Sequence, residues 1–301
     1  MWVIKYRKLF YTFSLILVIA SFVALGMWGV KPGIDFTGGT LVEVSYPDGR
    51  PEQSVVAAKL ATIDSSASIR PTGADGFIVR MKPTVQGEKA AVMSALSLDD
   101  ANKVIEKNFA SIGPVLGSEA LRKSIVSIVL VILAIVLFIT FVFRKVSEPV
   151  SSWKYGLVAI VALVHDIIIP MGVFAVLGHF IGYEVDTLFV TALLVVLGFS
   201  VHDTIVVFDR VRENLHNIGS SGKKPFEEVV GASVSQTFIR SINTSLTTLI
   251  ALVVLYILGG STTEHFALTL IIGIAAGTYS SIFVGSPLLV TIEKWQSKKQ
   301  K

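Results

Sequence analysis

The sequence predicts an α-helical integral membrane protein with six transmembrane helices and a small extracytoplasmic α+β domain between helices 1 and 2. Hydrophobic residues make up 52% of the 301 positions and charged residues only 16%, which is typical of membrane proteins. Six apolar stretches are each long enough to cross a hydrocarbon core of about 30 Å. They are residues 9–30, 124–143, 155–177, 187–208, 241–258 and 266–289.

The basic residues predict the orientation, because Lys and Arg near span ends are retained on the cytoplasmic side. The predicted outer loops, residues 179–186 and 259–265, contain no Lys or Arg. We expect helix 1 to be a retained anchor, since it is too long for the core of a typical signal peptide. The predicted regions are a cytoplasmic N-terminus with helix 1 at 1–30, an extracytoplasmic domain at 31–123, helices 2 to 6 at 124–291, and a basic cytoplasmic tail at 292–301.

Residues 31–123 alternate strand and helix patterns in the order of a ferredoxin-like βαββαβ domain. Ser97 is expected to restart the second helix as an N-cap, with Asp99 and Asp100 in its first turn. The Gly-rich residues 33–40 predict a tight turn into the first strand rather than a phosphate-cradling loop. We expect strands at 40–46, 67–71, 77–82 and 111–116, and helical regions at 51–63 and 88–109.

Composition also limits the chemistry of the chain. It contains no cysteine, which excludes disulfides, thiolate metal sites and Cys nucleophiles, and residues 31–123 contain no His. We therefore expect a non-enzymatic protein without catalytic residues, metal or cofactor, in which the exterior domain has a binding or mechanical duty. The net charge of +4 is expected on the cytoplasmic face, where it favours anionic membrane lipid and not nucleic acid.

The fourth span carries the most informative polar residue. From residue 187 to 208 only His202 and Asp203 are strongly polar. A carboxylate near the centre of such a helix costs about 2.5 to 3.5 kcal/mol on insertion scales, so Asp203 is a candidate functional group. Ser200, Asp203 and Thr204 share one helix face through i and i+3 spacing, and His202 lies beside them. The alternative is a carboxylate close enough to the cytoplasmic end to be solvated.

The third span has a second polar spot near its middle. His165 and Asp166 are adjacent, and Pro170 follows four residues after Asp166. Because proline lacks an N–H, the carbonyl of Asp166 is left without its helical partner, which predicts a locally polar, kinked site. The pair is a candidate for proton handling or, alternatively, only holds two helices together.

The fifth span begins with Arg240 and places Thr244 on the same stripe. Because the fourth span ends and the fifth begins on the cytoplasmic side, Arg240 and Asp203 are expected at similar depth, where they can pair. The alternatives are a hydroxyl-rich packing interface and an arginine that snorkels to the surface. A movable Asp203–Arg240 contact would act as a proton switch, since desolvation favours the neutral acid and a nearby guanidinium favours the charged one.

Residues 209–235, between the fourth and fifth spans, keep an apolar side, interrupted at 219–222. The pattern predicts two short interfacial helices on the cytoplasmic surface.

Five motifs are spread over most of the chain. They are GIDFTGGT at 33–40, SIGPVLGSEA at 111–120, HDTIVVFDRVREN at 202–214, Arg240 followed by SINTSLTT, and GTYSSIF at 277–283. In combination they resemble the SecF family, the accessory subunits of the bacterial protein-export translocase, within the resistance-nodulation-division type of membrane proteins. Residues 47–108 carry little of the likeness.

The resemblance implies a multi-pass protein of the bacterial cytoplasmic (inner) membrane with a partner, SecD, that supplies another six-span half. It also implies work with the SecYEG channel and the SecA motor, in which the proton-motive force promotes movement and release of preproteins on the outer side. Asp203 and Arg240 match the positions that the family uses for proton passage. His202 stands where Asn often precedes the Asp.

Three other functions fit parts of the pattern. Asp166 and Asp203 are the acids for an intramembrane aspartyl protease dyad, but the usual Gly-x-Gly-Asp context is absent. A small-molecule or lipid exporter of the same architecture generally carries both halves in one chain. A passive translocon scaffold would tolerate substitution of Asp203 and Arg240.

Overall fold

The computed structural model describes residues 2–84, 88–144, 150–218 and 224–299. It divides into two compact units, a membrane unit of Met1–Lys31 with Val126–Lys301 and an α+β unit of Pro32–Ile125.

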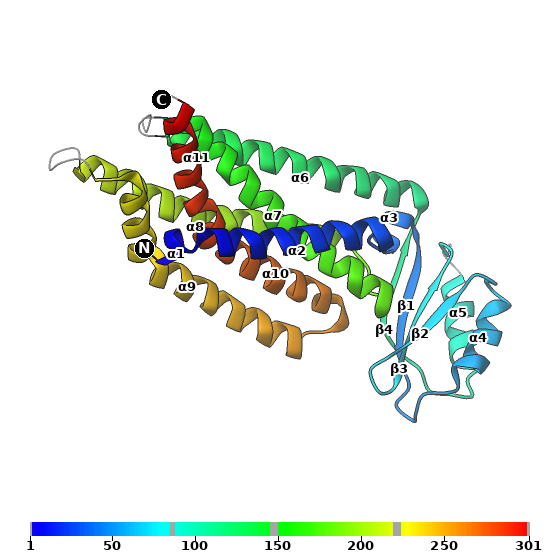
Figure 1. Cartoon of the computed structure of the whole chain (residues 1–301). Helices are drawn as coiled ribbons and strands as arrows, with labels where there is room; N and C mark the ends of the chain where they lie inside the picture. The colour runs from blue at the N-terminus through cyan, green and yellow to red at the C-terminus, as the bar shows by residue number, and fades with distance from the viewer. Residues whose placement is uncertain (1, 85–87, 145–149, 219–223, 300–301) are drawn as a thin grey trace. The chain divides into compact units, whose positions relative to one another are not determined.

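The α+β unit contains a four-stranded antiparallel sheet with the strand order β2-β3-β1-β4 (Figure 1). Its element order, β1 α4 β2 β3 α5 β4, and the sheet order confirm the predicted ferredoxin-like βαββαβ domain. The elements are α3 (Ile34–Thr37), β1 (Gly39–Ser45), α4 (Gln53–Ala61), β2 (Ser68–Thr72), β3 (Gly76–Met81), α5 (Glu88–Leu96) and β4 (Ile105–Ile112).

One face of this sheet forms the core of the unit with α4 and α5. Val42 and Val44 of β1 alternate toward this face, as expected for the period of two in a strand. They pack with Val56 and Leu60 from α4, all four fully buried. The alternation of apolar and polar residues in β1 therefore determines which face of the sheet α4 and α5 cover.

The second half of the α+β unit differs from the prediction. The helical region at 88–109 and the strand at 111–116 are wrong, because α5 ends at Leu96 and β4 occupies Ile105–Ile112. Three successive residues after Ser97 adopt positive φ and reverse the chain. Ser97 is not an N-cap of a restarted helix; its Oγ accepts the backbone N–H of Asp100 at 3.0 Å and closes this turn.

The Gly-rich segment before β1 contains one helical turn, α3, in place of the predicted simple tight turn. Gly38 ends it with φ 74°, a conformation that favours glycine. A Cβ on Gly38 would lie 2.7 Å from Cα of Pro114. The glycine therefore permits a close backbone approach between the start of the sheet and the segment that follows β4.

Asp64 is the carboxylate that we expect to make the α+β unit sensitive to acid. Its carboxylate accepts the backbone N–H of Lys82 at 2.8 Å and both the hydroxyl and the N–H of Ser66. These bonds lower the pKa of Asp64 to about 2, and the bond from the Lys82 N–H has the largest effect. An unfolded Asp titrates at about 3.9. The stabilisation is therefore complete above about pH 4 and lost as the pH falls toward 2.

We expect hydrogen exchange in β2 and β3 to accelerate between about pH 4 and 2 beyond the intrinsic change of exchange rate. Asp64→Asn should remove most of this pH dependence, because an amide does not titrate. Asp48→Asn, at an exposed carboxylate of the same unit, is the matched control and should keep the native profile. Equal profiles for the two variants would show that the Asp64 hydrogen bonds do not set acid stability.

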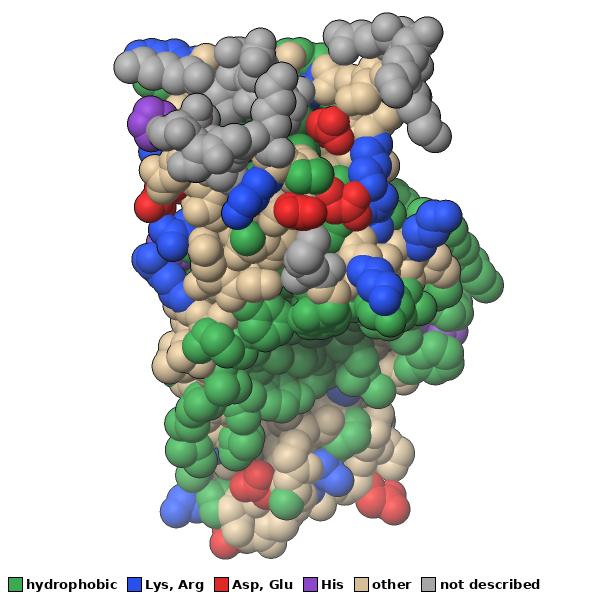
Figure 2. Space-filling view, turned by 60° about the vertical axis from the view of Figure 1, so that its left-hand side comes forward, with side chains coloured by type: hydrophobic (Ala, Val, Ile, Leu, Met, Phe, Trp, Pro, Cys, Tyr) green, Lys and Arg blue, Asp and Glu red, His purple; other side chains and the backbone are tan. Residues whose placement is uncertain are grey.

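The membrane unit contains six helices that are long and apolar enough to cross a membrane, which confirms the six predicted spans. On the face drawn in Figure 2, hydrophobic side chains form a band across this unit, with Lys and Arg gathered beyond one edge of the band. The helices are α1 (Trp2–Lys5), α2 (Arg7–Trp28), α6 (Pro114–Val142), α7 (Ser152–Phe180), α8 (Thr187–Ile218), α9 (Phe226–Leu258), α10 (Ser261–Tyr279) and α11 (Ser286–Lys299), with a π-helix, η1 (Ser280–Gly285), joining the last two.

Several spans are longer than the apolar pattern predicts. The two separate interfacial helices predicted within 209–235 are wrong, because α8 continues unbroken to Ile218 and α9 already begins at Phe226. The predicted break at 219–222 lies outside the described residues. Charged side chains do not end a helix whose backbone can still hydrogen-bond, so hydropathy marks where the lipid ends and not where the helix ends.

Small residues set the packing inside the membrane unit. Helices α2 and α7, and α8 and α10, lie side by side (Figure 1). A Cβ on Gly172 of α7 would lie 2.5 Å from Cα of Ser21 on α2, and one on Gly273 of α10 would lie 2.3 Å from a methyl of Val196. Such close approach is typical of membrane helices, whose interfaces are enriched in small residues.

Candidate functional site: two buried carboxylates among hydroxyl groups

Asp166 of α7 is fully buried and lies at a meeting point of four segments. Its Oδ1 lies 2.8 Å from Nδ1 of His165, and its Oδ2 receives the hydroxyls of Ser200 on α8 and Ser280 on η1 at 2.5 and 2.9 Å. The other ring nitrogen of His165, Nε2, lies 2.8 Å from Oγ of Ser14 on α2. Asp166 is thus well supplied with hydrogen-bond donors.

Asp203 of α8 is also buried, with 2% of its surface exposed, but it has poorer partners. The hydroxyl of Ser245 on α9 lies 3.4 Å from its Oδ2. That hydroxyl has a competing acceptor, the Ser241 carbonyl at 2.9 Å, and it lies 2.5 Å from Oγ1 of Thr278, where either oxygen can donate. The reading of Asp203 as a solvated carboxylate is therefore wrong for this structure.

Further hydroxyls connect the same helices. Thr204, next to Asp203, lies 2.8 Å from Oγ of Ser281, and Ser281 also lies 3.2 Å from the carbonyl of Ser200. The two carboxyl groups share no hydrogen bond in the described part of the chain. This separation does not match the shared-proton geometry of an aspartyl protease dyad.

Two of the segments that carry these residues have an irregular backbone close to them. Pro170 lies inside α7 and removes the N–H that would pair with the carbonyl of Asp166. The π-helix η1 begins at Ser280 and contains Ser281. A π-helix inside a longer helix often marks a functional site, because it turns side chains that an α-helix would direct elsewhere.

The remaining predicted residues lie outside this cluster. Arg240 is exposed, and within the described residues no ion pair joins it to Asp203, so the predicted contact is absent from this conformation. His202, the residue before Asp203 on α8, is exposed. Thr244 is half-buried and donates to the carbonyl of Arg240 at 2.9 Å, a bond within its own helix.

The sequence analysis missed several members of the cluster. Ser14 lacks a distinguishing local pattern, because single serines are common in membrane helices. Ser245 lies within the SINTSLTT motif, so a signal was present there. Thr278, Ser280 and Ser281 lie in or beside the GTYSSIF motif, so a signal was present. A run of hydroxyl residues within an apolar span, next to glycine, could have marked this stretch as the partner of the acids.

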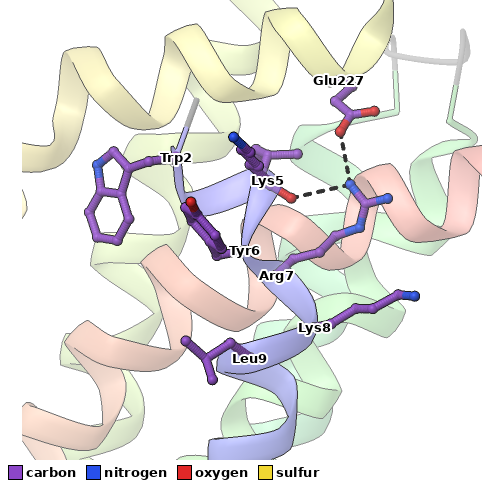
Figure 3. A pocket seen from close by; sticks show the side chains of 8 residues that line it. Trp2, Lys5, Tyr6, Arg7, Lys8, Leu9 and Glu227 are labelled. Carbon is purple, nitrogen blue, oxygen red and sulfur yellow. Dashed lines mark hydrogen bonds and ion pairs between the residues drawn. The ribbon is translucent and has the colours of Figure 1, made fainter.

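A cavity of about 850 Å³ lies elsewhere, around the start of α2 (Figure 3). It is lined by basic and aromatic residues, among them Lys5 and Tyr6, and by Glu227 at the start of α9. Glu227 pairs with Arg7 at 3.0 Å and with Lys294 of α11. None of its lining residues belongs to the carboxylate cluster.

No group of three or more His, Cys, Asp or Glu side chains within the described ranges is arranged to hold a metal ion. The arrangement instead suits proton exchange, since buried acids, an imidazole and hydroxyls can each accept or donate a proton or a hydrogen bond.

Two family models match the chain. Residues 93–295 match the model described as "Protein export membrane protein SecD/SecF, C-terminal", and residues 24–46 match "SecD/SecF GG Motif". The second match contains Gly38 and Gly39, which lead from α3 into β1. The two matches together cover part of the α+β unit, and they cover the membrane unit apart from residues 1–23 and 296–301.

Curated relatives cover almost the whole chain. Protein translocase subunit SecF of Thermobaculum terrenum is 42% identical over 309 residues, which span 98% of this chain and 94% of that protein. The SecF of Sebaldella termitidis is 35% identical and covers 97% of this chain and 92% of its own.

Solved structures agree. The crystal structure of SecDF from Thermus thermophilus, described as a translocon-associated membrane protein, matches with a TM-score of 0.80 and 28% identity over 98% of this chain. SecDF in its super-membrane-facing form matches with a TM-score of 0.69 and 29% identity over 99% of this chain. This chain spans only 38% and 39% of those two proteins. From these matches, the chain belongs to the SecF branch of the SecD/SecF family of protein-export membrane proteins.

Proposed function

We propose that this chain assembles with SecD and uses the proton-motive force to promote movement and release of preproteins on the outer side of the bacterial cytoplasmic membrane. Relatives named protein translocase subunit SecF support the transport role. The SecDF structures, of which this chain spans about two fifths, support a SecD partner. The resemblance of the motifs to the SecF family extends the proposal to the SecYEG channel and the SecA motor.

The observation that carries the proton-coupling part is the environment of Asp203. It lies in a membrane-spanning helix, is 2% exposed, and has no ion pair within the described residues. Burial of a carboxyl group disfavours its charged form, and a guanidinium brought nearby would favour that form. Arg240 is the candidate, from a position that is exposed in this conformation.

The proposed proton pathway therefore includes two conformations. In this one Asp203 is apart from Arg240 and holds a proton; in another the two are joined and the proton leaves. Thr204, which is hydrogen-bonded across to η1, and the His165–Asp166 pair lie on the same path. His202 and Thr244 have supporting places on α8 and α9.

The proposed orientation has both termini in the cytoplasm and residues 31–123 outside. The basic residues around the start of α2 and in α11 support it, because cytoplasmic ends retain Lys and Arg. Anionic lipid on that leaflet would then face the basic edge of the hydrophobic band.

The test is translocation into proteoliposomes that contain SecYEG, SecA, SecD and this chain. We expect a preprotein arrested midway to complete its passage faster when a proton gradient is imposed, and a protonophore to remove the increase. A passive scaffold would give the same rate with and without the gradient. Proton-driven efflux of a dye or lipid without any preprotein would favour the exporter.

A further inference from the structure

The His165–Asp166 pair is a buried titratable group that the Asp203–Arg240 switch does not use. It hydrogen-bonds to α2 through Ser14, to α8 through Ser200 and to η1 through Ser280. His165 is 5% exposed and Asp166 is fully buried. We infer that His165 is a second proton-binding site inside the membrane unit, with the proton held on Nε2 between the imidazole and Ser14.

The hydrogen bonds of Asp166 decide which nitrogen of His165 exchanges the proton. Ser200 donates to Oδ2, and Oδ1 faces Nδ1 of the imidazole at 2.8 Å. An ionised carboxylate only accepts, so Nδ1 must carry a hydrogen. Nε2 is then the nitrogen that gains and loses the exchanging proton.

Ser14 fits both charge states of the imidazole. When His165 is neutral, Nε2 accepts the Ser14 hydroxyl; when it is charged, Nε2–H donates to the same oxygen. A serine hydroxyl can donate and accept, so the 2.8 Å contact persists through the exchange. An apolar neighbour would leave one of the two states without a partner.

The buried negative charge of Asp166 favours protonation of His165. No Lys or Arg pairs with Asp166 among the residues that the structure describes, so the imidazolium is the cation next to this buried carboxylate. The other titratable groups nearby are Tyr279, whose ring stacks on the imidazole at 6.3 Å between centroids, and Asp203, one turn beyond Ser200 on α8. The Tyr279 hydroxyl donates to the carbonyl of Phe10 and carries no charge there.

The position of Ser200 couples the two proton sites. It lies three residues before Asp203 on one helix and bonds directly to Asp166. A proton on His165 neutralises the Asp166 site and so changes the charge that Asp203 meets when it ionises. The transport role of this second site rests on the proposed function, whereas its proton binding does not.

The test is a pH titration of the imidazole ¹⁵N signals by NMR, on the full chain in lipid nanodiscs. His165→Gln identifies the signal among the five histidines. We expect the Nε2 signal of His165 to change from the hydrogen-bond acceptor form to the protonated form as the pH is lowered. Exposed His216 on α8 is the internal reference and should not respond to changes at Asp166.

Two variants should shift the titration in opposite directions. Asp166→Asn removes the counter-charge and should lower the proton affinity of His165 at least about tenfold. Ser200→Ala removes a hydrogen-bond donor that stabilises the Asp166 carboxylate, so the proton affinity of His165 should rise. A structural role alone predicts neither shift.

A His165 signal that stays neutral over the whole range would overturn the inference, as would unchanged midpoints in both variants. If Asp166→Asn does not fold, Ser200→Ala alone decides, since it keeps the His–Asp pair. The titration needs no preprotein or partner, so a negative translocation result leaves it intact. Conversely, a His165 that stays neutral removes this pair from the proposed pathway, but it does not decide whether Asp203 couples translocation to the proton gradient.

Discussion

Asp203→Asn is expected to abolish the increase in preprotein movement that a proton gradient produces, while the variant still assembles with SecD. An asparagine has nearly the same shape as a protonated Asp but cannot release a proton. Each proton that crosses 100 mV supplies about 2.3 kcal/mol, enough to bias a conformational equilibrium about fifty-fold. The variant should lose this bias entirely and keep the rate measured without a gradient.

The matched control is Asp209→Asn, six residues along the same helix. Asp209 is exposed and pairs with Arg212 at 2.5 Å on the surface of α8. Replacing it removes one carboxylate without changing the buried cluster, and surface pairs of this kind contribute at most about 1 kcal/mol. Gradient-dependent translocation should therefore be retained. Retention in Asp203→Asn as well would remove Asp203 from the pathway.

Gly172→Ala is expected to destabilise the membrane unit by about 1–3 kcal/mol, which is typical of overpacking. The new Cβ would lie 2.5 Å from Cα and 2.3 Å from Cβ of Ser21, so a rotamer change cannot relieve the contact and α2 must move away from α7. Thermal unfolding in detergent measures the loss. Gly26→Ala on α2, where a Cβ meets nothing within 4 Å, is the control and should leave stability almost unchanged.

The same substitution should also disturb the proton site. Ser14 and Ser21 are seven residues apart on α2, and His165 and Gly172 are seven apart on α7. Two helical turns therefore separate the Ser14–His165 contact from the Gly172–Ser21 contact. A shift of α2 at Gly172 should weaken the hydrogen bond to Nε2. If Gly172→Ala unfolds at the same temperature as the native chain, α2 and α7 have space for the added methyl group, in contrast to the contact seen in the structure.

Some boundaries of the helices and strands follow from the local sequence, and others depend on the tertiary structure. The alternation in β1 and the long apolar runs follow from period and length, which are local properties of the chain. The end of α5 does not, because three residues with positive φ after Ser97 reverse the chain where the pattern still reads as helical. The unbroken extension of α8 past its apolar run is a second example.

The sequence by itself determined the fold class and the six spans. It also marked two acids as candidate functional groups, because burying charge in an apolar helix is costly wherever the helix packs. Only the tertiary structure decided which groups face those acids. Ser14 and Ser280 reach the His165–Asp166 pair from opposite ends of the chain, and among the described residues Arg240 is exposed and forms no ion pair with Asp203. The physical reason is that helix rotation and the π-turn at η1 are set by close packing between helices, which no local pattern encodes.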